Sequence, residues 1–91
     1  MYSTQQKPFN FVDSKRATRR QVSFTLDTEG SRNWVLNVDG TKYEVWKTTL
    51  VVTNRRGYVI DVQPFKFTLN ALRDTEDKIW KEIVAKREDA Q

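Results

Sequence analysis

The stretch WVLNVDGTKYEVW, residues 34–46, contains the strongest local fold signal in the chain. Large apolar side chains recur at every second position on both sides of Asp39-Gly40, which is the pattern of half-buried β-strands. A two-residue hairpin turn requires positive φ at its centre, and Asp-Gly adopts this conformation readily. The stretch therefore predicts an antiparallel hairpin that turns at Asp39-Gly40.

The same alternation continues on both sides of this hairpin. Residues 22–26 and 58–62 repeat the period of two, and Gly57 supplies a residue suited to a second turn. We therefore expect four strands, at residues 22–26, 34–38, 43–46 and 58–62, which form an antiparallel meander within residues 20–66.

The period changes after Pro64. Residues 70–87 place Leu72, Ile79 and Ile83 at helical spacing, which predicts one amphipathic helix. The predicted fold class is therefore α+β: a four-stranded antiparallel β-meander followed by one C-terminal helix. We expect the helix to pack on the sheet face that carries Trp34, Leu36 and Val45.

The domain organisation follows from length and polarity. Ninety-one residues suit one small domain. Residues 1–19 are polar and show no sustained period, which predicts a flexible basic N-terminal arm before a sheet-and-helix domain at 20–91. The uninterrupted aliphatic run Leu50-Val51-Val52 is far shorter than the roughly 20 residues of a membrane helix. The amino terminus lacks the apolar core of a secretory signal, so we expect a soluble cytoplasmic protein without a membrane partner.

The composition narrows the chemistry. The sequence has no histidine and no cysteine, and thus lacks the commonest general base and the most readily activated nucleophile. The three glycines are isolated from one another, so no glycine-rich phosphate loop is present. We therefore expect a protein that is not an enzyme and that uses no cofactor or metal.

The positive charge is concentrated near the amino terminus. The whole chain has a net charge of +4, and residues 1–22 contain five cations and one anion. This asymmetry favours an anionic partner such as DNA or RNA. The first functional hypothesis is therefore a nucleic-acid-binding domain that uses the basic arm and a hairpin tip.

Nine residues are candidates for that interface. Cations would contact phosphates and make binding sensitive to salt, and an exposed tryptophan would stack on bases. The candidates are Lys15, Arg16, Arg19 and Arg20 in the arm, Lys42, Trp46 and Lys47 around the third strand, and Arg55 and Arg56 at the second turn.

The second hypothesis is a protein-interaction module. A turn at residues 54–57 is expected to place Val51 on the helix side and Val52 on the opposite side of the sheet. One helix about 10 Å across covers only part of one face, so a second apolar face needs another cover. The expected members of the second face are Val35, Trp46, Leu50, Val52 and Val59. Trp46, Leu50 and Val52 are the candidate partner interface, shielded by a second copy in a homodimer, by another protein, or by Phe9 and Phe11.

Overall fold

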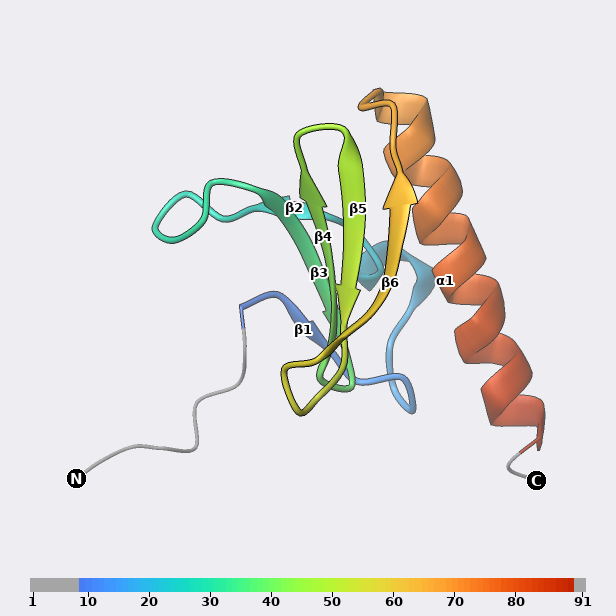
Figure 1. Ribbon diagram of the computed structural model, residues 1–91. Helices are drawn as coiled ribbons and strands as arrows, with labels where there is room; N and C mark the ends of the chain where they lie inside the picture. Colours follow the sequence, from blue (N-terminus) through green and yellow to red (C-terminus); the bar gives the residue numbers. More distant parts are fainter. Residues whose placement is uncertain (1–8, 90–91) are drawn as a thin grey trace.

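The computed structural model describes residues 9–89 and contains one mixed β-sheet with one long helix against it (Figure 1). The strands are β1 (Phe11–Val12), β2 (Thr25–Leu26), β3 (Trp34–Val38), β4 (Thr41–Trp46), β5 (Thr49–Thr53) and β6 (Val59–Pro64), and the helices are the 3₁₀ turn η1 (Arg19–Gln21) and α1 (Leu69–Asp89). The sheet order is β1-β3-β4-β5-β6, with β2 also paired to β3.

The α+β class is confirmed, but the sheet differs from the predicted one. Strands β3 to β6 form an antiparallel meander, while the short β1 joins β3 in the parallel direction. Only Thr25–Leu26 of the predicted first strand pairs with β3. Val22 and Phe24 are buried in the core without belonging to a strand.

The central hairpin is confirmed. Trp34 pairs with Val45 and Leu36 with Tyr43, as the turn position predicts. Asp39 and Gly40 have φ values of 53° and 95°, so both adopt the left-handed conformation that a two-residue hairpin turn requires.

The predicted faces of the β5 residues were wrong. Leu50 pairs with Val45 and Val52 pairs with Tyr43, so both side chains lie on the helix side and are buried. Val51 pairs with Glu44 and lies on the opposite side. The cause is a tight turn between β4 and β5 at residues 47–48, and it leaves neither Leu50 nor Val52 available on the second face.

The helix prediction is confirmed. The Thr68 hydroxyl accepts a hydrogen bond from the Ala71 N–H at 3.0 Å and satisfies one donor of the first turn. Leu72, Ile79 and Ile83 are buried in the same core as Leu36, Val45 and Leu50.

The folded core begins before the expected boundary at residue 20. Val12 and Ala17 are buried within the core, in the stretch assigned to the arm. The Arg87 guanidinium donates hydrogen bonds to the carbonyl oxygens of Ser14 at 2.6 Å and Ala17 at 2.7 Å. We call residues 13–24 the strap, because they are fastened to α1. The first part of the predicted arm, residues 1–8, lies outside the described residues.

A buried carboxylate fastens the other end of the strap. Glu76 of α1 accepts the Phe24 backbone N–H at 2.8 Å, and both residues are buried. A buried N–H without an acceptor costs about 1–3 kcal/mol, so this hydrogen bond is a main constraint on the strap.

The substitution Glu76→Ala tests this constraint. We expect it to lower the free energy of unfolding by about 1–3 kcal/mol, because the Phe24 N–H loses its acceptor. Glu76→Gln retains an oxygen acceptor and should cost less. The measurement is urea denaturation of both variants, and equal losses would contradict the role of this hydrogen bond.

Candidate functional site

Three chain segments and the end of α1 meet at one end of the sheet (Figure 1). The turn at residues 13–17, the Asp39-Gly40 turn and the turn at residues 54–57 lie there together. A shallow depression between them is lined by Phe11, Asp13, Ser14, Lys15, Asp39, Thr41, Arg55 and Lys86. The fold thus gathers Lys15, Arg55 and Lys86 from three distant parts of the sequence.

Gly40 allows Arg55 to reach this depression. A Cβ atom at residue 40 would lie only 2.6 Å from the Arg55 Cγ, so the arginine stem occupies space that any other residue would fill. Arg56 belongs to the same turn, and Arg16 belongs to the same turn as Lys15. We call Lys15, Arg16, Arg55, Arg56 and Lys86 the basic end.

The two carboxylates at the basic end already bond to the protein. Asp39 accepts the Ser14 backbone N–H at 2.9 Å and the Ser14 hydroxyl, and lies 4.0 Å from the Lys86 Nζ. Asp13 accepts the Lys15 backbone N–H at 2.9 Å. Lys15, Arg55 and Lys86 line the depression with these two carboxylates, and Glu82 of α1 lines an adjoining hollow together with Asp39 and Lys86.

Asp39 is held in its ionised form. Burial alone would raise its pKa, but the hydrogen bonds from Ser14 and the charge of Lys86 outweigh burial and lower the pKa below the ordinary 3.8. A lowered pKa in the folded state stabilises the fold above pH 3.8, and this contribution is lost as the pH falls through the folded-state pKa.

We expect Ser14→Ala to raise the Asp39 pKa towards its ordinary value, because the hydroxyl donor is removed. The contribution of Asp39 to stability above that value should shrink accordingly. NMR titration of the Asp39 carboxyl measures the shift. Ser31→Ala is the control, because Ser31 donates to Asp27 instead; an unchanged Asp39 pKa in Ser14→Ala would contradict the assignment.

The four arm cations do not act as one cluster in the structure. Arg19 donates from Nε to Asp77 at 3.0 Å and from Nη1 to the Val22 carbonyl at 3.0 Å, so its guanidinium fastens the strap to α1. Arg20 is exposed on η1. Of the four, only Lys15 lines the depression, and Arg16 follows it in the same turn.

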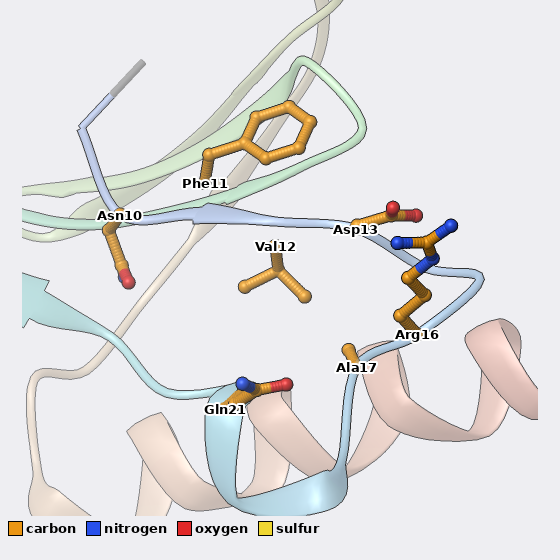
Figure 2. Close-up of a pocket in the computed structure, with 7 residues that line it drawn as sticks. All are labelled: Asn10, Phe11, Val12, Asp13, Arg16, Ala17 and Gln21. Carbon is orange, nitrogen blue, oxygen red and sulfur yellow. The ribbon is translucent and has the colours of Figure 1, made fainter. Parts of the chain in front are cut away.

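A second hollow lies between β1 and η1 (Figure 2). Val12 points into it, Phe11 points to the other side of β1, and Arg16 lies beside Asp13 at the margin. The Asn10 amide at its rim already donates to the carbonyl oxygens of Ser23 and Val35. The Asn10 amide is therefore already engaged within the protein, and we do not include this hollow in the candidate site.

The sheet face opposite α1 is partly uncovered. Trp46, Val59 and Val62 on this face are 51%, 56% and 59% exposed. Strand pairing sets Trp46 beside Thr49 and Pro64, which is also exposed. We call the exposed side chains of β4 to β6 on this side the open face.

Phe9 and Phe11 do not cover Trp46. Phe9 is itself 46% exposed, and β1, which contains Phe11, is separated from β4 by β3. The predicted cover of Trp46 by these two residues was therefore wrong.

The open face carries a paired charge and a tryptophan with a cation above it. Lys42 lies 3.4 Å from Glu44, which also accepts the Asn33 amide at 2.9 Å. Burial opposes ionisation of Glu44, but these two partners lower its pKa below the ordinary value. Lys47 places its Nζ 4.8 Å from the Trp46 ring centroid. Trp46 and Lys47 lie at the end of β4 away from the basic end.

The sequence predicted that the arm acts together with the hairpin tip, and the structure places Lys15 and Arg55 in one depression. Lys15 and Arg55 line the depression together with Lys86, and Arg16 and Arg56 are only their neighbours in sequence. Lys42 and Trp46 lie on β4, and Lys47 follows it. Lys86 was missed because helical spacing alone does not show which turn a helix end approaches. Its sequence signal was only a cation in the last turns of the helix.

The β6 edge is poorly suited to strand addition. Thr53 pairs with Val59 and Val52 with Asp61, so Ile60 forms a β-bulge. The Phe65 N–H donates to the Thr48 carbonyl oxygen, towards β5. Because successive N–H groups along a strand point in opposite directions, the Pro64 nitrogen points to the outer edge of the sheet, where it has no hydrogen to donate to another chain. Bulges and prolines protect edge strands from pairing with other chains.

Within residues 9–89, no group of three or more histidine, cysteine, aspartate or glutamate residues is placed to hold a metal ion. No helix in that range is long and apolar enough to cross a membrane. Comparisons with protein-family models, curated proteins and solved structures found no match.

Proposed function

We propose that this protein is a non-catalytic nucleic-acid-binding domain that contacts phosphates through its basic end. The observation that carries the proposal is the convergence of Lys15, Arg55 and Lys86 on one depression. Three separate segments supply these cations, and the folded strap holds one of them in place.

Within residues 9–89, four of the cations at the basic end are not paired with a carboxylate and can therefore contact an anionic ligand. Among the described residues, Lys15, Arg16, Arg55 and Arg56 have no carboxylate within ion-pair distance. The nearby Asp13 and Asp39 already accept hydrogen bonds from the strap. Each phosphate that such cations neutralise releases condensed counterions, which favours binding at low salt.

The double substitution Lys15→Ala/Arg55→Ala tests this proposal. We expect weaker binding to DNA and RNA of any sequence, because phosphate contacts carry no base information. The slope of log affinity against log salt should flatten by about 1.8 for duplex DNA and about 1.4 for single strands. Fluorescence anisotropy at several salt concentrations measures both quantities.

The matched control is Arg73→Ala/Lys81→Ala, which removes two exposed cations of α1 away from the basic end. Both double variants change the net charge from +4 to +2, because each loses two cations. Equal losses of affinity in the two variants would show that only total charge matters. Absence of binding by the parent protein at low salt would refute the proposal.

A second candidate function is protein interaction through the open face. The specific observation is that Trp46, Val59 and Val62 are all more than half exposed there. Contiguous exposed apolar residues mark interaction sites in many proteins. A second copy of the chain is the simplest partner for such a face.

The substitution Val62→Asp tests self-association through this face. A charge forced into an apolar contact is unfavourable, so the variant should sediment as a smaller species than the parent protein if the face forms a homodimer. Leu69→Asp changes an equally exposed apolar residue outside the open face and is the control. A parent protein that sediments as a monomer at high concentration would exclude the homodimer.

A further inference from the structure

The open face connects the basic end to Trp46, an exposed tryptophan whose ring has the Lys47 ammonium over it. Lys42 lies on β4 near the basic end, and Trp46 with Lys47 lies at the opposite end of the same strand. The Trp46 side chain is half exposed, and within residues 9–89 no other ring is paired with it. An exposed indole beside a cation matches the platforms on which unstacked bases bind.

We propose that a single strand of DNA or RNA lies along β4 on the open face, and that Trp46 stacks on one of its bases. The proposal rests on the proposed function, because the same strand would contact the basic end with its phosphates. Beyond the proposed function, this proposal specifies that the nucleic acid is single-stranded and that it follows β4.

Unpaired nucleic acid fits this surface better than a duplex. In a duplex each interior base is already stacked on both faces, whereas an unpaired base can leave its stack and meet an aromatic ring. A duplex would therefore use the basic end alone. Loss of Trp46 should affect single strands and leave duplex affinity unchanged.

The length of β4 sets the size of the site. Strand β4 has six residues, Thr41–Trp46, and the five steps along it span about 17 Å, because a strand rises about 3.4 Å per residue. Bases that keep their stacked spacing of about 3.4 Å would number about five over this distance, and splayed bases would be fewer. Affinity should therefore rise with oligonucleotide length and level off near five nucleotides.

The polar groups of this face favour binding without sequence preference. The Asn33 side-chain amide donates to Glu44, and the Asn37 side-chain oxygen Oδ1 accepts the Gly40 N–H at 2.8 Å. Glu44 is paired with Lys42. The exposed groups of β6 on this face are the apolar Val59, Val62 and Pro64, which can contact a base or sugar of any kind, and Thr49 and Thr53 of β5 are half-buried beside them.

Two observations favour a nucleic acid over a second copy of the chain. Cations stand at both ends of the face, Lys47 at one and Arg55 with Arg56 at the other, and two copies face to face would bring like charges together. The bulge at Ile60 and the position of Pro64 also disfavour extension of the sheet across β6.

The experiment compares parent protein, Trp46→Ala and Trp46→Phe by fluorescence anisotropy. The probes are labelled oligo(dT) and oligo(U) of two to ten nucleotides and one mixed-sequence DNA duplex. Stacking on one base predicts a loss of roughly 5- to 150-fold for single strands in Trp46→Ala, with unchanged duplex affinity. Trp46→Phe retains a ring and should recover most of the affinity.

The outcomes separate this inference from the proposed function. Single-strand affinity unchanged in Trp46→Ala, in a variant shown to be folded by circular dichroism, would overturn the inference while the basic-end proposal stands. An equal loss for duplex and single strand would overturn it as well. No binding of any probe by the parent would remove both proposals, and a Trp46→Ala variant that dissociates a parent dimer would assign the face to self-association.

Discussion

The Asp39-Gly40 turn is the constraint on which the rest of this structure depends. Its positive φ values set the register of β3 against β4, and this register decides that Trp46 faces away from α1. The Asp39 carboxylate binds Ser14 and so holds the strap beside the turn. The absent side chain of Gly40 leaves the space that the Arg55 stem occupies. One turn therefore sets the sheet register and assembles the basic end.

Local signals were sufficient to predict the hairpin and the helix, and insufficient for the face of β5. The Asp-Gly pair and the spacing of Leu72, Ile79 and Ile83 are determined within a few residues. The turn between β4 and β5 instead places Lys47 at a φ of 55°, a conformation that lysine rarely adopts and that its neighbours do not signal. Because the prediction did not include this turn, it assigned Leu50, Val51 and Val52 to the wrong faces of the sheet.

The candidate site could be predicted only in part as an arrangement: the sequence paired the arm with the hairpin tip, but it did not show that Arg19 turns to α1 or that Lys86 joins the depression. Arg55 and Arg56 follow from turn chemistry, because a hairpin tip is exposed wherever it lies. The position of the Arg19 guanidinium depends on its hydrogen bond to Asp77, which is 58 residues away in sequence. The contribution of Lys86 depends in the same way on where α1 ends over the sheet. Cations that look alike in a basic run therefore acquire different roles through tertiary contacts.

These contacts divide the cations of the strap region into two groups. Arg87 fixes the beginning of the strap to α1 through the Ser14 and Ala17 carbonyl oxygens, and Arg19 fixes its middle through Asp77. Lys15 and Arg16 lie between Ser14 and Ala17, the two residues whose carbonyl oxygens Arg87 binds, and their side chains are exposed. Fixing the backbone of a binding segment beforehand reduces the entropy lost on association. If the proposed binding occurs, Arg19 and Arg87 would favour it by holding the backbone that carries Lys15 and Arg16 in place.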